Sequence, residues 1–269
     1  MLLPLGFDSA ARDAKLLAAH ALGFSALDMA TREQEPVTNE QIFALTELMQ
    51  RRMRGESVAR IIGEREFYGL AFTLNAATLE PRPETELLVD LALNALPQAG
   101  RLLDLGTGTG CIPIAILANR PDASAVATDL SALALAAARH NAERHAVADR
   151  LELLHGSWFE PLSADQRKFD LIVSNPPYIT SAVVETLAPE VKDFDPRLAL
   201  DGGPDGLAPY RIIAAGAAGY LTPTGAVLVE IGYDQGQAVS ALFEAAGYTQ
   251  IAVHQDLNGL DRLVSARQI

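Results

Sequence analysis

The sequence contains one cysteine, Cys111, among 269 residues. A single cysteine cannot form an internal disulfide, and such sparse use is typical of proteins kept in a reducing cytosol. We therefore predict a cytoplasmic protein in which Cys111 is a small apolar helix residue rather than a reactive thiol.

Long hydrophobic runs are also missing. No apolar stretch approaches the roughly 18 residues that a membrane-spanning helix needs. Residues 1–8 have neither the basic start nor the long apolar segment of a signal peptide. We expect no membrane association. Hydrophobic residues make up 49 % of the chain, enough for a large α/β domain with a smaller one beside it.

Positive charge is scarce as well. Lys and Arg number 21 against 34 Asp and Glu, which gives a net charge of −13. Because nucleic-acid binding depends largely on neutralising phosphates, we expect no direct nucleic-acid contact. The one local basic cluster is interpreted as a solvated helix end, with a docking patch as the alternative; it comprises Arg51, Arg52, Arg54, Arg60 and Arg65.

Metal-ligand spacing is absent from the histidines and the cysteine. His140 and His145 miss the i, i+4 spacing that would place them on one helix face, and the other histidines are scattered. We predict no metal site.

The first part of the chain has helical periodicity. Apolar residues recur at helical spacing in 10–22 and 39–54, with Thr38 or Asn39 as a plausible N-cap. Residues 1–56 are predicted to form a small helical domain. Two strand-like runs follow, at 59–62 and 67–74, and predict a β-hairpin linker over residues 57–80.

From residue 101 onward, strands alternate with helices, which predicts an α/β region with a mostly parallel sheet over residues 81–269. Asn258-Gly259 is a turn signal, so the last two strands are predicted to form an antiparallel hairpin. The expected strands are 101–105, 123–128, 151–155, 169–174, 225–231, 249–255 and 262–267.

Asn175-Pro176-Pro177-Tyr178 follows one of these predicted strands. The prolines fix φ and lack N–H groups, so the chain leaves the strand in a rigid direction. The Asn175 amide oxygen and the Pro176 carbonyl can then accept hydrogen bonds from one small –NH2 group, with the ring of Tyr178 beside them. Such a pocket suits a planar amino or amide nitrogen at the carboxyl end of a strand.

A glycine-rich turn, Gly106 to Gly110, lies between the strand at 101–105 and a predicted helix at 111–119. Glycines let the backbone approach a ligand closely at a helix N-terminus. Asp129 ends the next strand, where its carboxylate can accept both hydroxyls of a ribose.

The spacing of these glycines distinguishes between two candidate cofactors, a nicotinamide dinucleotide and S-adenosylmethionine. A dinucleotide fingerprint begun at Gly106 would need a glycine where Cys111 stands. The pattern from Asp104 to Gly110, D-x-G-x-G-x-G, is more typical of S-adenosylmethionine (SAM) sites. We therefore predict SAM over a nicotinamide cofactor, with Asp104 either contacting SAM or capping the end of its strand.

Together these motifs resemble the HemK/PrmC family, the protein-(glutamine-N5) methyltransferases that act on peptide chain release factors. The resemblance covers nearly the whole chain and includes residues 13–23, 63–69 and 81–86 and the Asp201-Gly202-Gly203 loop. Glu80 and Asp195 depart from the family pattern. The resemblance implies a class I SAM-dependent methyltransferase fold, which is Rossmann-like, after the N-terminal helical domain.

The resemblance also implies the site residues. Asp129 would bind the ribose and Trp158 would lie against the adenine. Asn175, Pro176 and Tyr178 would be catalytic, and with Pro177 they would bind the substrate glutamine, while Asn175 would also touch SAM. The residues implied around the methionine part of SAM are Asp104, Gly106, Thr107, Gly108, Thr109 and Gly110.

By the same resemblance, the reaction would methylate the side-chain nitrogen of the glutamine in the Gly-Gly-Gln loop of release factors, leaving S-adenosylhomocysteine and modulating translation termination. We expect a monomer whose helical domain selects the protein partner.

Other functions stay open at this level. A related methyltransferase acts on a glutamine of a large-subunit ribosomal protein, but residues 13–23 favour the release-factor branch. Adenine-N6 methyltransferases share Asn-Pro-Pro-Tyr, and the acidic balance counts against them. A catalytically silent SAM-binding module is a third alternative, opposed by the intact motifs at Asp129 and 175–178.

Overall fold

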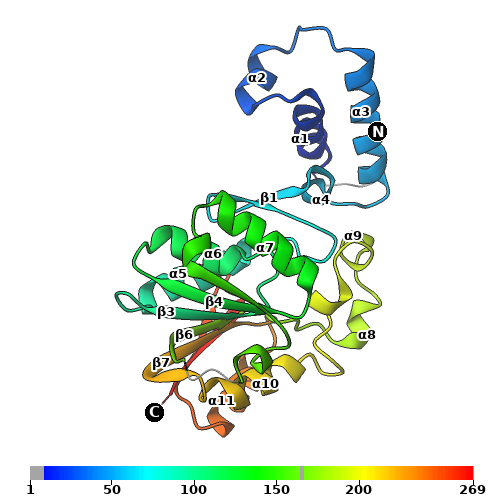
Figure 1. The fold of residues 1–269 in the computed structure, drawn as a ribbon. Helices are drawn as coiled ribbons and strands as arrows, with labels where there is room; N and C mark the ends of the chain where they lie inside the picture. Colours follow the sequence, from blue (N-terminus) through cyan, green and yellow to red (C-terminus); the bar gives the residue numbers. More distant parts are fainter. Residues whose placement is uncertain (1–8, 164–166, 269) are drawn as a thin grey trace.

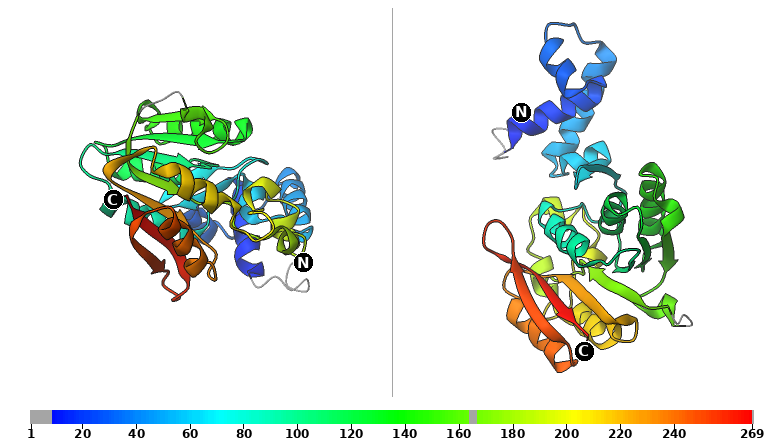
Figure 2. Two further views of the ribbon diagram at one scale, coloured as in Figure 1. Left: turned by 90° about the horizontal axis from the view of Figure 1, so that it is seen from below. Right: turned by 90° about the vertical axis from the view of Figure 1, so that its left-hand side faces the viewer.

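The computed structural model describes residues 9–163 and 167–268. A helical N-terminal region stands on one side of an α/β core and is joined to it through a short hairpin (Figures 1 and 2). Within the described ranges, no helix combines the length and hydrophobicity that a bilayer crossing requires. The expectation about a signal peptide falls on residues 1–8, outside these ranges.

The N-terminal region comprises α1 (Ala10–Leu22), α2 (Ala26–Thr31), α3 (Asn39–Met53) and α4 (Val58–Ile62). Thr38 caps α3, as predicted: its hydroxyl accepts a hydrogen bond from the Gln41 N–H at 3.2 Å, and the Gln41 side chain accepts one from the Thr38 N–H at 2.9 Å. The core of this region is small, and Leu17 is its fully buried large side chain.

The segment 59–62, predicted as a strand, is helical, so that prediction is wrong. The Ser57 hydroxyl accepts a hydrogen bond from the Arg60 N–H at 3.2 Å and starts α4, and Gly63 at φ 81° ends it. The hairpin lies further along, with β1 (Glu64–Phe67) paired antiparallel to β2 (Leu70–Thr73). Its two turn residues, Tyr68 and Gly69, both have positive φ, the geometry that favours tight hairpins.

Four arginines of the basic cluster form ion pairs. The interpretation as a solvated helix end is wrong for Arg52 and Arg60, whose side chains are 6 and 7 % exposed, while Arg51 and Arg65 remain partly exposed in their pairs. Arg52 pairs with Asp13 and with Glu190 of α9 (Pro189–Lys192), at 2.7 and 2.6 Å. The cluster therefore joins segments that are distant in the chain. The other pairs are Arg51–Glu56, Arg60–Asp195 and Arg65–Glu80.

The core is a seven-stranded sheet in the order β5-β4-β3-β6-β7-β9-β8. The first five strands in this order run parallel, and β9 pairs antiparallel with β7 and β8. This confirms the predicted mostly parallel sheet with an antiparallel C-terminal pair. The bounds are β3 Arg101–Leu105, β4 Ser124–Asp129, β5 Leu151–His155, β6 Phe169–Ser174, β7 Leu221–Glu230, β8 Thr249–Gln255 and β9 Asp261–Arg267.

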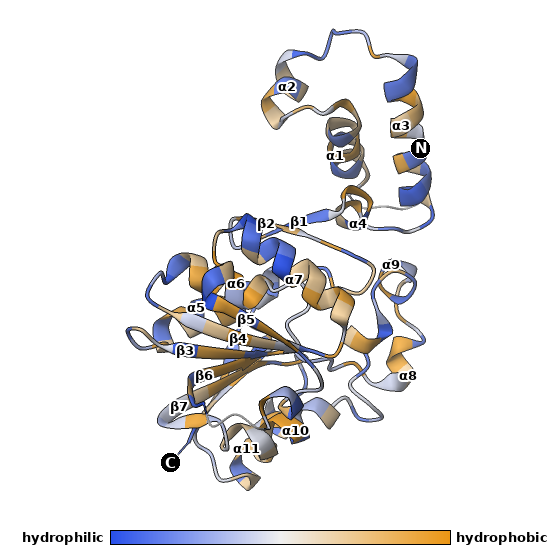
Figure 3. Ribbon diagram, in the orientation of Figure 1, coloured by the Kyte–Doolittle hydropathy of each residue, from blue (hydrophilic) through white to orange (hydrophobic). Residues whose placement is uncertain are grey.

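Helices cover both faces of the sheet (Figure 1). One face is packed by α5 (Glu86–Ala95), α6 (Cys111–Asn119) and α7 (Ala132–Arg144). The other is packed by α10 (Ala208–Ala217) and α11 (Gly236–Ala245). The buried strands are coloured as hydrophobic along most of their length, while α7 is hydrophilic toward its C-terminal end (Figure 3).

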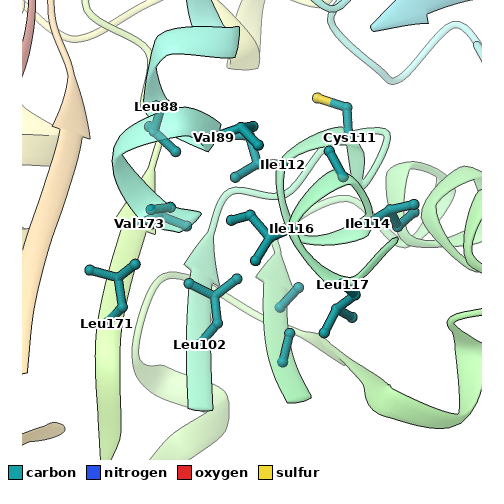
Figure 4. Packing of buried hydrophobic residues seen from close by; sticks show 14 of the residues in the cluster. Leu88, Val89, Leu102, Cys111, Ile112, Ile114, Ile116, Leu117, Leu171 and Val173 are labelled. Atoms are coloured by element: carbon teal, nitrogen blue, oxygen red, sulfur yellow. The ribbon is translucent and has the colours of Figure 1, made fainter. Parts of the chain in front are cut away.

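Close packing on the first face is shown in Figure 4, where Leu88 of α5 and Ile116 of α6 meet Leu102 of β3 and Val173 of β6. Cys111 lies in the same cluster, 8 % exposed, and burial raises the pKa of its thiol to about 12. A thiol in this environment stays protonated, in agreement with the predicted apolar role.

Strand order places the candidate motifs together. From β3 the chain proceeds to β4 on one side, while β6 lies on the other side of β3. Ligands of open α/β sheets bind at such a switch point, outside the carboxyl ends of the strands. The glycine-rich turn follows β3, and the Asn-Pro-Pro-Tyr segment follows β6, so both lie at this point.

Candidate functional site

A cavity of about 590 Å³ opens at the carboxyl edge of the sheet. Its volume lies within the usual range for small-molecule sites. The wall combines the ends of β3, β4 and β6 with segments 77–85 and 196–203. The predicted site residues on this wall are Gly106, Thr107, Gly108, Thr109, Asp129, Trp158, Asn175 and Pro177, while Asp104, Gly110, Pro176 and Tyr178 lie outside it.

The glycine-rich turn is held by backbone hydrogen bonds to β4. The Gly106 and Thr107 N–H groups both donate to the Thr128 carbonyl, at 2.9 and 3.0 Å. Gly106 and Gly108 have φ of 76° and 56°, and a Cβ built on either would meet no atom within 4 Å. Their left-handed backbone, not crowding, requires glycine here, and the surface above them is open to a ligand.

Gly110 has a packing role. A Cβ at this position would lie 2.9 Å from the Ile114 side chain and 3.2 Å from Ala138 of α7. Gly110 thus allows α6 and α7 to approach each other, which explains its place outside the cavity wall.

Asp129 is oriented by two backbone groups. Its carboxylate accepts hydrogen bonds from the Gly108 and Ser131 N–H groups, both at 2.8 Å and on different oxygens. Burial raises the pKa of Asp129, and these two N–H groups oppose the rise. Each oxygen keeps a lone pair, so the fixed carboxylate can accept two hydroxyls from a ligand in the cavity.

Asp104 is fully buried beside the turn, and neither of its carboxylate oxygens has a hydrogen-bond partner. Burial raises the pKa of Asp104 to about 7; the Thr107 hydroxyl opposes this rise from a position that falls short of a hydrogen bond, and Asp129 adds to it. The predicted strand cap is therefore not formed. An uncompensated buried carboxyl suits a cationic ligand nearby, because such a charge would stabilise its ionised form.

Trp158, the only tryptophan in the sequence, lies both at the cavity and against the core. Its half-buried side chain lines the cavity and also packs against the core beneath α10 and α11. The backbone φ of 48° is uncommon for a bulky residue. The surrounding packing thus holds this ring at the cavity at a conformational cost.

Asn175 has a fixed side-chain orientation. Its Nδ2 group donates a hydrogen bond to the Thr85 hydroxyl at 3.1 Å. Burial raises the pKa of Glu230 to about 7, opposed by hydrogen bonding from Thr85 and, to a smaller extent, from Asn175. Because the Thr85 hydroxyl accepts from Nδ2, the amide oxygen is the free end. Within the described ranges, neither this oxygen nor the Pro176 carbonyl accepts a hydrogen bond.

Tyr178 faces the core more than sequence reasoning suggested. Its ring packs against the buried cluster around Tyr210 and Val229, and burial raises the pKa of its hydroxyl to about 12, with the charge of Glu230 contributing. Pro176 is buried as well. The side chains of these two residues support the turn from behind, while Asn175 and Pro177 reach the cavity and the Pro176 carbonyl keeps its acceptor capacity.

The Asp-Gly-Gly loop lies directly against this turn. A Cβ on Gly202 would come within 2.7 Å of the Pro177 carbonyl oxygen and 2.9 Å of the Tyr178 Cα. The Ser181 hydroxyl donates to Asp201 at 2.6 Å, and the Gly202 N–H donates to the Ile179 carbonyl at 2.8 Å. The loop therefore fixes the backbone that presents Asn175.

Thr85 and Glu230 were not among the predicted site residues. Thr85 belongs to the Pro-Arg-Pro-Glu-Thr-Glu segment, whose proximity to the site the sequence pattern did not reveal. Glu230 could have been found from the sequence, because it is a charged residue at the end of the apolar run of β7. In the structure it is 3 % exposed. Buried charges of this kind mark functional sites more often than chance.

The site residues fit a nucleoside that carries a cationic amino-acid part. Asp129 offers acceptors for ribose hydroxyls, Trp158 an aromatic ring, and Asp104 an uncompensated carboxyl near the open turn. In residues 9–163 and 167–268, no three His, Cys, Asp or Glu side chains gather as metal ligands would.

Comparison with known families divides the chain in two. Residues 1–63 match the PrmC N-terminal domain, and residues 83–191 match the methyltransferase small domain.

Curated relatives match nearly the whole chain. A release factor glutamine methyltransferase of Agrobacterium fabrum is 47 % identical over 262 residues, which cover 95 % of this chain and 90 % of the relative. A protein of the same name from Cereibacter sphaeroides is 48 % identical over 262 residues, covering 97 % and 92 %.

Solved structures share the fold at low sequence identity. The hMettl16 catalytic domain, solved in complex with MAT2A 3'UTR hairpin 6, has a TM-score of 0.61 at 15 % identity, covering 79 % of this chain and 82 % of that one. A methyltransferase from Pyrococcus furiosus has a TM-score of 0.57 at 16 % identity, covering 83 % and 100 %. These similarities confirm the predicted Rossmann-like methyltransferase fold.

Proposed function

The chain belongs to the release factor glutamine methyltransferase family, and from this premise we propose that it methylates the side-chain nitrogen of the Gly-Gly-Gln glutamine in peptide chain release factors, with SAM as methyl donor. Relatives at 47 and 48 % identity over almost the full length support this. The observation that carries the proposal is the orientation of Asn175, whose amide oxygen is free at the cavity.

The cofactor half of the site is formed by the turn after β3 and by Asp129. The open backbone at Gly106 and Gly108 would surround the amino-acid part of SAM, and Asp104 would stabilise its ammonium group from behind the turn. Asp129 would accept the ribose hydroxyls and Trp158 would contact the adenine. When bound, SAM supplies an activated methyl group on a sulfonium sulfur.

The substrate half is formed by Asn175 and Pro176. An amide nitrogen is a poor nucleophile because its lone pair is delocalised into the carbonyl. The Asn175 Oδ1 and the Pro176 carbonyl would accept the two N–H bonds of the substrate carboxamide, hold the nitrogen, and direct its lone pair toward the methyl group. Positioning of this kind can lower a barrier by roughly 7–11 kcal/mol.

The same two acceptors would act more strongly as the reaction proceeds. Positive charge develops on the nitrogen when the N–C bond forms, and its N–H groups become better donors to Asn175 and Pro176. The nitrogen then loses one proton to water, which restores a neutral amide. No strong base at the cavity is needed for this step.

The remaining expectations follow from the family. A release factor is the protein partner, the N-terminal helical region contributes to its selection, and the reaction takes place in the cytoplasm and modulates translation termination. We propose that the enzyme acts as a monomer.

A side-by-side assay tests this function. Purified enzyme with methyl-labelled SAM is offered a release factor, a large-subunit ribosomal protein and DNA in separate reactions. Label is expected on the release factor alone, and peptide mass spectrometry should assign it to the glutamine of the Gly-Gly-Gln loop. Label on DNA, or on the ribosomal protein alone, would contradict the proposal.

A further inference from the structure

Asp195 joins three parts of the chain through two arginines. One carboxylate oxygen accepts hydrogen bonds from the Arg60 Nε and Nη2 atoms at 3.1 and 2.5 Å. The other accepts one from Arg82 at 2.9 Å. Arg60 belongs to α4 of the helical region and Arg82 to the cavity wall. The side chains of Asp195 and Arg60 are only 3 and 7 % exposed, so this pair is buried, while the Arg82 side chain is 39 % exposed.

Arg60 also bonds to the segment that forms another part of the cavity wall. It donates to the Asn75 carbonyl at 3.1 Å and to the Thr78 carbonyl at 2.5 Å. Ala77 and Leu79, on either side of Thr78, line the cavity. One guanidinium from the helical region therefore holds both the 75–78 segment and the segment that begins at Asp195.

Asp195 directly precedes residues 196–203, which form the cavity wall next to the Asn-Pro-Pro-Tyr turn and are called the substrate-side wall here. The next residue, Pro196, lines the cavity, and so do Leu198 and Ala199. The far end of this stretch is fixed by Asp201, whose carboxylate accepts hydrogen bonds from the Ser181 hydroxyl and the Gly203 N–H. The wall is thus fastened at both ends, to the Asn-Pro-Pro-Tyr side by Asp201 and to the helical region by Asp195.

We propose that Asp195 is a positioning residue: through Arg60 it links the substrate-side wall of the cavity to α4, at the base of the N-terminal helical region. The inference rests on the proposed function and adds a residue to it. A change in how α4 sits moves Arg60, and through Asp195 it moves the wall beside the Asn175 turn. A protein substrate held by the helical region is in this way aligned with the pocket for its glutamine.

Asp195 and its two arginines make no direct hydrogen bond to the cofactor half of the cavity, where the Gly106 and Thr107 N–H groups bond to Thr128, and Asp129 bonds to Gly108 and Ser131. The link that exists runs from Arg60 rather than from Asp195: Asn75, whose carbonyl accepts from Arg60, donates to the Leu133 carbonyl of α7 at 2.8 Å. Loss of the Asp195 charge should therefore impair use of the protein substrate and leave SAM binding intact. A residue that merely supports the fold would impair both.

The test compares Asp195→Asn with Asp193→Asn, a matched change at an exposed position two residues earlier. For Asp195→Asn, kcat/KM for the release factor should fall about 10- to 100-fold, while the SAM dissociation constant changes less than about two-fold. Asp193→Asn should match the wild type in both, and Asp195→Glu, which keeps the charge, should recover part of the loss.

A double-substitution cycle checks that Arg60 and Asp195 act together. If they do, Arg60→Met combined with Asp195→Asn should lose little more activity than the worse single variant. Hydrogen exchange gives a readout without turnover: Asp195→Asn should speed exchange at the Ala199, Leu200 and Gly202 amides, which are bonded in the wild type, with no change at Gly106.

Three results would overturn the inference. Asp195→Asn could match Asp193→Asn in kcat/KM, it could weaken SAM binding in proportion to activity, or the two substitutions of the cycle could be additive. Failure of the proposed function would look different, because the wild type itself would then not methylate the release factor.

Discussion

The Asn175 side-chain amide donates a hydrogen bond to the Thr85 hydroxyl at 3.1 Å, across 90 positions of the sequence. This contact connects the turn after β6 to the start of α5. It decides which end of the Asn175 amide faces the cavity, and on this orientation the proposed recognition of a carboxamide depends.

Thr85→Val should therefore reduce methyl transfer without affecting SAM. The isosteric valine removes the acceptor for Asn175 Nδ2, so the amide can rotate and offer N–H groups where oxygen is needed. We expect kcat to fall about 10-fold or more, as for other losses of a group that orients a catalytic side chain. Steady-state kinetics and calorimetric SAM titration measure the two effects. The control is Thr46→Val, at an exposed site on α3; equal kcat for both variants would refute the orienting role.

Gly202→Ala should displace the Asn-Pro-Pro-Tyr turn. Its new Cβ would lie 2.7 Å from the Pro177 carbonyl oxygen, and both are backbone-fixed, so the turn or the loop must shift. We predict loss of most methyl transfer and a lower unfolding temperature. Gly219→Ala is the control, since its Cβ has a nearest neighbour at 3.3 Å. Full activity of Gly202→Ala would show that the loop does not set the position of Asn175.

The buried carboxyls Asp104 and Glu230 should make the folded state less stable as pH rises. Burial raises both pKa values to about 7 in the folded protein, from the ordinary values of 3.8 for Asp and 4.5 for Glu. Between these limits the folded state holds protons that the unfolded state has released, so stability contributed at low pH is lost as pH rises toward 7.

The free energy of unfolding of Asp104→Asn should accordingly increase relative to that of the wild type when the pH is raised from 5 to 8. The expected change in this difference is on the order of 3 kcal/mol. Urea unfolding at both pH values measures this difference. Asp193→Asn, at an exposed site, should show no such gain. A stability difference for Asp104→Asn that does not change with pH would mean that Asp104 titrates normally.

The same carboxyl should make SAM binding depend on pH. A bound ammonium group favours ionised Asp104, so SAM affinity should rise from pH 6 to about pH 7.5, by up to about 10-fold per pH unit below the pKa of Asp104. Asp104→Asn should bind SAM more weakly and without this rise. Calorimetry across the range gives the dependence, and parallel curves for the two proteins would exclude Asp104 as its source.

The strands and the motifs that follow them could be predicted because their signals are local. The bounds of β3, β5 and β6 coincide with the predicted ones. A parallel strand that is buried on both faces can be recognised from a short continuous apolar run alone. The run at 59–62 was too short to distinguish strand from helix, and the cap at Ser57 and the left-handed Gly63 decided for helix.

The site was predicted only in part, because some of its contacts arise from topology. The sequence motifs predicted that Gly106, Asp129 and Asn175 belong to one ligand site, and the structure places all three on the wall of one cavity. The contact of Asn175 with Thr85 and the network at Asp195 join segments whose proximity no local pattern encodes. The packing of the Tyr178 ring against the core could not be predicted from the motif, because it depends on residues that are distant in the sequence.

The most direct test of the account replaces Asn175 by alanine and follows the glutamine of a release factor by mass spectrometry. Wild-type enzyme with SAM should add one methyl group to that glutamine, and Asn175→Ala should add none detectable while binding SAM with nearly unchanged affinity. Comparable methylation by Asn175→Ala would contradict the claim that its amide oxygen holds the substrate carboxamide.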